Sequence, residues 1–214
     1  MMKDVKVLLF DLGGVIIDID PSNTINTLRS LSKDPSNNFS GLDYRYSKEK
    51  SPLLQIFFEY EKGNISDDIF RDGIRKIGNI DASNSKIDSI WNSVIVKIYR
   101  DLLDVIFSLR NRFKIMILSN TNYIHKKHFN QLVVEMYGKR FDELFDMVFY
   151  SYELGTRKPE KKIYQRVLDD CKFEGSDILF FDDMKENLEA SEMVGMKTFH
   201  VRDLASIKKF LKTI

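Results

Sequence analysis

The sequence predicts an α/β fold, a doubly wound parallel sheet with an all-helical insertion. Five short apolar runs have the length of buried strands, and the last four alternate with segments whose apolar residues recur every three or four positions. Such alternation implies right-handed crossovers and a parallel sheet that is covered on both faces. By contrast, residues 20–97 contain no convincing strand pattern and are typical of several helices joined by polar turns.

These patterns place the elements in order along the chain. The expected strands are residues 5–10, 114–118, 147–150, 178–181 and 197–201. The expected core helices are residues 101–111, 123–136, 160–171, 185–194 and 203–212. Residues 1–19 and 98–214 should therefore form the core domain, and residues 20–97 a helical cap that folds over the sheet edge as a lid. Residues 32–41 are the most loop-like segment, which we expect to be locally mobile.

The composition disfavours some kinds of binding partner, such as nucleic acid and membranes. The chain has 214 residues, with 33 Lys and Arg against 32 Asp and Glu, so it lacks the basic excess typical of proteins that bind nucleic acid or anionic membranes. No apolar run is long enough to span a bilayer. A single cysteine, Cys171, and an N-terminus without an apolar leader indicate a cytoplasmic protein. We expect a small-molecule partner, and either a monomer or a homodimer.

Polar side chains follow four of the expected strands. They are Asp11, Ser119, Asn120, Lys158, Asp182 and Asp183. In a parallel α/β sheet, ligands bind beyond the carboxyl ends of the strands, so these side chains should converge on one crevice. Gly13 and Gly14 follow Asp11, and glycine allows a close backbone approach that a side chain would block.

Charge predicts the chemistry of this crevice. Three carboxylates within a few ångströms repel one another by roughly several kcal/mol unless a cation lies among them. An all-oxygen site with few protein ligands suits Mg²⁺. A metal, a lysine and a hydroxyl around Asp11 fit a phosphoryl group, which Asp11 would attack while Lys158 and Ser119 bind its oxygens. The Gly13 carbonyl can face the metal, and backbone N–H groups at Gly13 and Gly14 can approach the phosphate.

Four motifs, taken together, resemble a known family. "FDLGGV" (10–15), "LSNTN" (118–122), "RKPE" (157–160) and "FFDD" (180–183) have the order typical of the haloacid dehalogenase-like (HAD) hydrolase superfamily. The closest resemblance is to the branch with a helical cap after the first strand, and within it to phosphatases of sugar phosphates such as glucose 1-phosphate. The resemblance covers nearly the whole chain.

The resemblance also implies roles for the residues that match. Asp11 would be the nucleophile that becomes an aspartyl phosphate, and Ser119 and Lys158 would bind the phosphoryl group. Asp11, the Gly13 carbonyl and Asp183 would hold Mg²⁺. Asp182 would act mainly from outside the metal's direct ligands or through water, and Asn120 would contact either the substrate or only its own turn.

Two residues depart from the family pattern. Most phosphatases of the superfamily have Asp where this chain has Gly13, and that Asp protonates the leaving oxygen. Losing a positioned acid costs roughly 10²–10⁴-fold in rate, which favours a leaving group that needs little protonation. The second departure is Asn187, where the superfamily often has another carboxylate.

Other functions remain open at this point. Asp11 of a dehalogenase would attack carbon and displace halide without a metal, and Gly13 also permits a weakly catalytic protein that binds a phosphorylated metabolite. A nucleotide-binding Rossmann domain is disfavoured because "DLGGV" lacks the G-x-G-x-x-G turn. We expect His125 and His128 to be solvated or partly packed residues of a surface helix, and Arg157, next to Lys158, is a candidate for a secondary anion contact.

Overall fold

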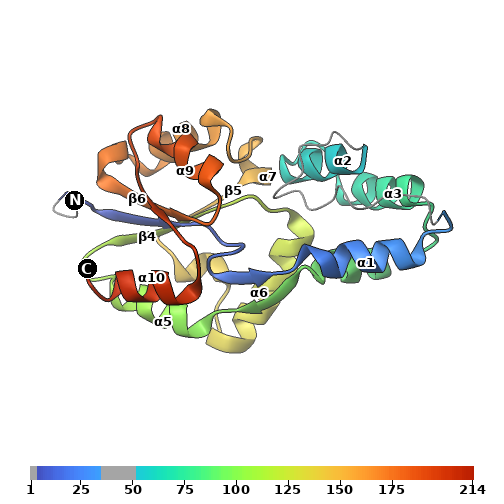
Figure 1. Cartoon of the computed structure of the whole chain (residues 1–214), viewed down its shortest axis with the longest axis horizontal. Coiled ribbons are helices and arrows are strands. Elements are labelled where there is room, and N and C mark those ends of the chain that lie inside the picture. Colours follow the sequence, from blue (N-terminus) through green and yellow to red (C-terminus); the bar gives the residue numbers. More distant parts are fainter. Residues whose placement is uncertain (1–3, 35–51) are drawn as a thin grey trace.

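A computed structural model, which describes residues 4–34 and 52–214, has a parallel five-stranded sheet at its centre (Figure 1). The strands are β1 (Val7–Phe10), β4 (Lys114–Ser119), β5 (Met147–Tyr150), β6 (Ile178–Asp182) and β7 (Lys197–His200). Their order in space is β5-β4-β1-β6-β7. The chain therefore extends the sheet from β1 in one direction and then in the other, and the order of strands reverses beside β1, where α/β folds bind ligands.

Helices cover both faces of this sheet. One face packs against α5 (Arg100–Ser108), α6 (Tyr123–Tyr137) and α10 (Leu204–Leu211), and the other against α8 (Lys161–Cys171) and α9 (Lys185–Glu192) (Figure 1). Successive residues of β1 alternate between the faces: Leu8 and Phe10 belong to the first core cluster, and Val7 and Leu9 to the second. All four are fully buried. Burial on both sides explains why the strands are continuous apolar runs.

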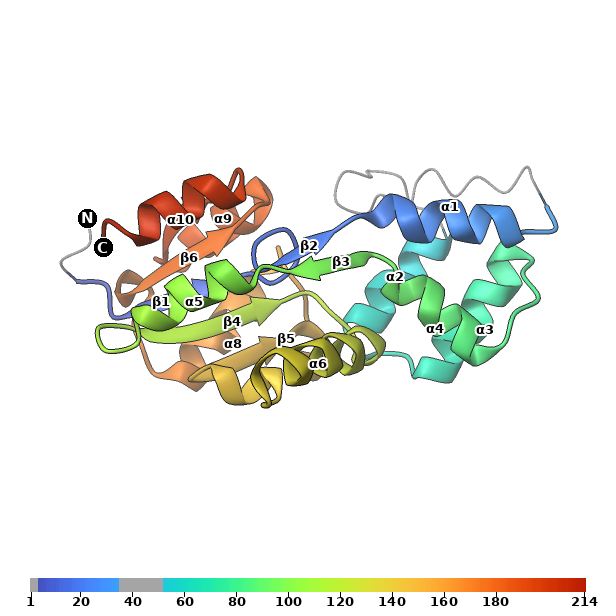
Figure 2. The same ribbon diagram turned by 90° about the horizontal axis from the view of Figure 1, so that it is seen from below.

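A separate group of helices lies beyond the carboxyl ends of the strands (Figure 2). It contains α1 (Pro21–Leu31), α2 (Pro52–Glu61), α3 (Asp67–Gly78) and α4 (Asn84–Asn92). These helices have their own apolar core, in which the Phe70 ring packs against Phe57, Tyr60 and Trp91. We call these four helices the cap.

The cap is joined to the sheet by a feature that the sequence did not predict. β2 (Ile17–Ile19) and β3 (Ile95–Ile98) form an antiparallel pair that connects the two parts (Figure 2). The expectation that residues 20–97 contain no strand is therefore wrong for residues 95–97, which belong to β3. The two central residues of β3 are exposed, so the strand lacks the apolar run by which the others were recognised.

The remaining elements agree closely with the sequence prediction. Each of the five expected core strands and five expected core helices is present, with ends shifted by three residues or fewer. Short elements were not predicted: α7 (Ser151–Leu154), η2 (Phe141–Leu144) and η3 (Gly175–Asp177). Within the described residues, no helix combines the length and the apolar character that crossing a membrane requires. Most of the segment expected to be mobile, residues 35–41, lies outside the described residues.

Candidate active site

The polar residues that follow the strands meet at the carboxyl edge of the sheet, because β1 lies between β4 and β6. Asp11 is 7% exposed, and its backbone N–H donates to Phe181 O at 2.8 Å, which continues the pairing of β1 with β6. Its carboxylate oxygen Oδ1 also accepts a hydrogen bond from the Leu12 N–H at 2.6 Å. The sheet thus fixes both the position and the orientation of the Asp11 carboxylate.

Lys158 lies between two of the acids. Its Nζ is 2.7 Å from Asp11 Oδ1 and 2.7 Å from Asp182 Oδ2, and the side chain is 1% exposed. Asn120 holds the lysine in place from β4: its Oδ1 accepts from the Lys158 N–H at 2.8 Å, and its Nδ2 donates to Lys158 O at 2.9 Å. The Asn120 amide is therefore engaged with the backbone of Lys158.

Three carboxylates form a group that could hold a metal ion. One oxygen of each of Asp11, Asp182 and Asp183 lies within 4.8 Å of the others. Asp182 is fully buried, and besides Lys158 it accepts hydrogen bonds from Met184 N at 2.8 Å and from Asn187 Nδ2 at 2.9 and 3.1 Å. With its oxygens occupied in this way, Asp182 is suited to orienting its neighbours more than to binding a metal directly.

The charges of this group do not balance. Burial raises the pKa of Asp11 well above its usual range, the charges of Asp182 and Asp183 act in the same direction, and Lys158 opposes them. Burial also acts to lower the pKa of Lys158, but the charges of Asp11 and Asp182 outweigh it and raise that pKa. Lys158 contacts two of the three carboxylates, and the third, Asp183, has an oxygen within 4.8 Å of theirs, so a further cation would stabilise the site.

Gly14 allows the backbone to approach these carboxylates. Its φ is +77°, a conformation that residues with a Cβ adopt at a cost, and a Cβ there would lie 2.5 Å from Asp183 Oδ2. A side chain at position 14 would therefore push Asp183 out of the acidic group. The two glycines differ, because Gly13 does not have a left-handed backbone.

Replacing Gly14 by Ala should weaken Mg²⁺ binding by about ten-fold or more, as expected when the support of a metal ligand is disturbed. Titration calorimetry with Mg²⁺ measures this directly. Gly138→Ala is the matched control, because Gly138 has a φ of +67° and nothing within 4 Å of the added Cβ. Both variants carry the backbone cost of about 1 kcal/mol, but only Gly14→Ala meets Asp183. Equal Mg²⁺ affinity in the two variants would contradict this account of Gly14.

A cavity lies beside the acidic group, between the sheet edge and the cap. It is lined on the core side by Gly13, Ser119 and Asn120, and on the other side by Glu61 of α2 and by aliphatic residues. Ser119 is 2% exposed, and its Oγ lies 3.4 Å from Asn120 O. The structure therefore places the hydroxyl and the glycine predicted for the site around one cavity.

Two residues that line or border this cavity make contacts that the sequence did not predict. His125, expected to be a solvated or partly packed helix residue, lines the cavity. Burial lowers the pKa of His125 to about 3, its ring stacks on Trp91, and its Nδ1 is 3.0 Å from Asn92 Oδ1. Arg157, the candidate for a secondary anion contact, donates from Nε to the carboxylate oxygen Oε2 of Glu61 at 2.9 Å. Both contacts involve the cap, so local sequence patterns could not reveal them.

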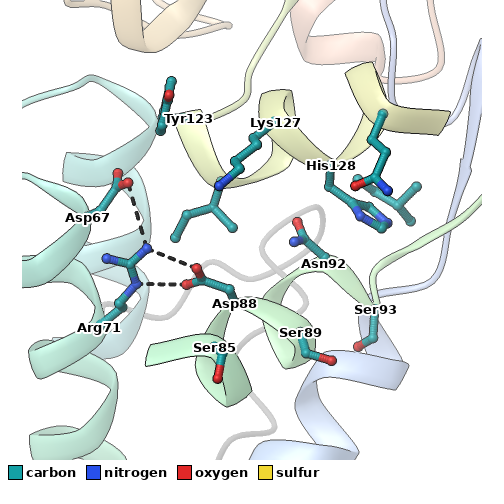
Figure 3. A pocket seen from close by; sticks show the side chains of 13 residues that line it. Asp67, Arg71, Ser85, Asp88, Ser89, Asn92, Ser93, Tyr123, Lys127 and His128 are labelled. Atoms are coloured by element: carbon teal, nitrogen blue, oxygen red, sulfur yellow. Dashed lines mark hydrogen bonds and ion pairs between the residues drawn. The ribbon is translucent and has the colours of Figure 1, made fainter. Parts of the chain in front are cut away.

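A second, larger hollow of about 560 Å³ lies between the cap and α6 (Figure 3). Its lining includes Lys127 and His128 of α6 and Arg71 of α3, but none of the residues predicted for the site. The Arg71 guanidinium donates to both oxygens of Asp88 at 2.8 and 2.9 Å, so its charge is already paired. The acids that line this hollow, Asp67 and Asp88, are both paired with Arg71, so the hollow lacks the acidic group that the predicted chemistry needs.

Comparisons with known proteins agree with this geometry. The family model of haloacid dehalogenase-like hydrolases matches residues 5–195. D-ribitol-5-phosphate phosphatase of Bacteroides thetaiotaomicron is 27% identical over 210 residues, which cover 98% of each chain. A solved structure of the HAD family enzyme bt-2542 from the same organism, in complex with magnesium and inorganic phosphate, is 30% identical, covers 95% of this chain and 98% of that one, and superposes with a TM-score of 0.81.

Dehalogenases are similar to the chain in fold. The L-2-haloacid dehalogenase RSc1362 covers 98% of this chain with a TM-score of 0.64 at 16% identity, which shows a shared architecture only. The resemblance based on four short motifs is thus confirmed across the whole fold by a family model that spans most of the sequence. The chain belongs to the haloacid dehalogenase-like hydrolases, and it is an enzyme of that family.

Proposed function

We propose that the protein is a Mg²⁺-dependent phosphatase that hydrolyses a small phosphorylated metabolite, with a sugar or sugar-alcohol phosphate favoured. The observation that carries this proposal is the acidic group itself: three carboxylates within 4.8 Å, with Lys158 bonded to two of them. This group needs a cation, and together with a lysine it can neutralise the oxygens of a phosphoryl group.

The reaction has two steps in this proposal. A carboxylate oxygen of Asp11 attacks phosphorus, the bond between phosphorus and the leaving oxygen breaks, and an aspartyl phosphate forms. Water then attacks the phosphorus of that intermediate, which releases inorganic phosphate and restores Asp11. Lys158 and Ser119 would bind the phosphoryl oxygens, and Asn120 would keep Lys158 in position through its two backbone bonds.

The donor atoms fit Mg²⁺. Carboxylate oxygens and a backbone carbonyl are the ligands this ion prefers, and Gly14 keeps space beside Asp183. Asp11, Asp183 and the Gly13 carbonyl would hold the ion, with Asp182 acting through Lys158, Asn187 or water. When bound, it would neutralise charge that develops on the phosphoryl oxygens.

Gly13 bears directly on which leaving groups the site can release. Gly13 leaves no carboxylic acid two residues after the nucleophile, which favours leaving groups that depart with little protonation. The relative from Bacteroides thetaiotaomicron is named for D-ribitol 5-phosphate, whose leaving group is an alkoxide that does need a proton. Similarity therefore points to a sugar-alcohol phosphate, whereas Gly13 points to an anomeric or acyl phosphate, and both kinds are the first substrates to test. We infer that the substrate is a small phosphorylated metabolite, and sugar and sugar-alcohol phosphates are the candidates we favour.

Phosphate release should depend on added Mg²⁺ and disappear with EDTA. We expect this result in a screen of sugar phosphates, sugar-alcohol phosphates, nucleotides and acyl phosphates, because without the cation the three grouped carboxylates repel one another and the phosphoryl group. Turnover that is unchanged in EDTA would contradict the role given to the acidic group. Halide release from a 2-haloacid without metal would favour a dehalogenase, and tight binding of a metabolite without turnover would favour a binding protein.

A further inference from the structure

We propose that Glu61, the last residue of α2, selects the substrate's leaving group: it accepts hydrogen bonds from hydroxyl groups and repels leaving groups that carry a negative charge. This inference rests on the proposed phosphatase function. It assigns to one cap residue a specificity that the acidic group itself does not provide.

The position of Glu61 supports this role. The residue is 6% exposed and lines the same cavity as Gly13 and Ser119, on the side opposite the sheet. A substrate whose phosphoryl group lies at Asp11 would extend its leaving group into this cavity. The Glu61 carboxylate would then be the group from α2 that meets it.

Arg157 of the core domain holds the Glu61 carboxylate, which can still accept further hydrogen bonds. Arg157 Nε donates to Glu61 Oε2 at 2.9 Å, and the Arg157 guanidinium lies 4.0 Å from the centre of the Phe58 ring. A carboxylate has about four lone-pair sites, so one bond to Arg157 leaves the others for hydroxyl donors. Because Arg157 directly precedes Lys158, this contact connects the cap to the segment that reaches Asp11.

Arg157 offsets part of this negative charge from outside the cavity, and the lining itself adds no further cation. Among the described residues that line the cavity there is no lysine or arginine. His125 is the remaining titratable group there, and burial keeps it neutral because it lowers its pKa to about 3. Ile17 and Ile95 are among the aliphatic residues that complete the wall. A short, neutral hydroxylated group suits this lining and the cavity volume of about 50 Å³ better than a carboxylated group does.

Two substrates that differ in one group test the idea. Glycerol 3-phosphate and 3-phosphoglycerate differ in a hydroxymethyl group and a carboxylate. The wild-type enzyme should prefer glycerol 3-phosphate by about ten-fold or more in kcat/KM, since a like charge within several ångströms raises the barrier by at least that factor. The readout is the ratio of the two kcat/KM values, in which a general loss of activity cancels.

Two variants should move this ratio in opposite directions. Glu61→Gln removes the charge and should lower the preference for glycerol 3-phosphate about ten-fold. Arg157→Gln removes the cation that partners Glu61 and should raise the preference for glycerol 3-phosphate. This variant gives an independent test if Glu61→Gln fails to fold. Glu59→Gln is the matched control, because Glu59 lies on the same helix and its carboxylate accepts from Asn64 Nδ2 at 2.8 Å, away from the cavity.

The outcomes separate this inference from the proposed function. A ratio that Glu61→Gln and Arg157→Gln leave at the wild-type value, or a wild-type preference for 3-phosphoglycerate, would overturn the role of Glu61 while phosphatase activity remains. Failure of the wild-type enzyme to hydrolyse even p-nitrophenyl phosphate with Mg²⁺ would overturn the phosphatase proposal, and the inference with it. Opposite shifts in the two variants, with Glu59→Gln at the wild-type ratio, would support it.

Discussion

Replacing Asp11 by Asn should lower phosphate release by about 10⁴-fold or more, because the variant lacks the proposed attacking carboxylate. The same change should leave the fold intact or stabilise it. The pKa of Asp11 is raised in the folded protein, which means that folding disfavours its charged form at neutral pH. Removing that charge removes a repulsion, so the midpoint of urea unfolding without metal should stay the same or rise.

A control separates this effect from a general loss of charge. Asp169 is exposed on α8, where its carboxylate accepts a hydrogen bond from Gln165. Asp169→Asn should therefore keep wild-type turnover and stability. Measurable turnover at the wild-type rate in Asp11→Asn would remove Asp11 from the role of nucleophile.

Replacing Lys158 by Met should destabilise the metal-free protein strongly and abolish turnover. Lys158 bonds both Asp11 and Asp182 and is 1% exposed, so its loss leaves two buried carboxylates without their shared cation. Removing one partner of a buried ion pair typically costs about 3–5 kcal/mol. Urea unfolding without metal measures that cost, and Mg²⁺ should restore part of it because it supplies positive charge to the same carboxylates.

The sign of the stability change distinguishes the two variants. Asp11→Asn removes an excess negative charge, whereas Lys158→Met removes the cation that compensates it, so they should shift the unfolding midpoint in opposite directions. Lys162→Met on the exposed surface of α8 is the control for losing a lysine and should leave stability unchanged. A Lys158→Met protein as stable as wild type in EDTA would show that the carboxylates do not repel one another as described.

The core could be predicted from sequence because its strands are buried on both faces. Strands of this kind are continuous apolar runs, and in a parallel sheet their carboxyl ends meet at one edge, so the residues after Phe10, Leu118 and Phe181 could be grouped without coordinates. The β2–β3 pair escaped prediction for the opposite reason. It is short and half exposed, so its pattern does not stand out from that of the neighbouring helices.

The contacts that complete the cavity depend on tertiary structure. Glu61 begins a polar stretch that is typical of a turn, and only the docking of α2 against the segment before Lys158 brings it to Arg157. His125 lies on a helix with no strong apolar face, and stacking on Trp91 of the cap covers part of its ring. Neither pairing has a local sequence signal, since the partners of each pair are distant in sequence.

The central claim is that Asp11 accepts the phosphoryl group from the substrate. Acid-quenched turnover of the wild-type enzyme with Mg²⁺, followed by mass spectrometry of its peptides, tests this most directly. The peptide that contains Asp11 should gain the mass of one phosphoryl group, and the gain should vanish in EDTA. Phosphorylation of a different residue, or steady turnover in which trapping under every quench condition finds no phosphorylated Asp11, would contradict the account.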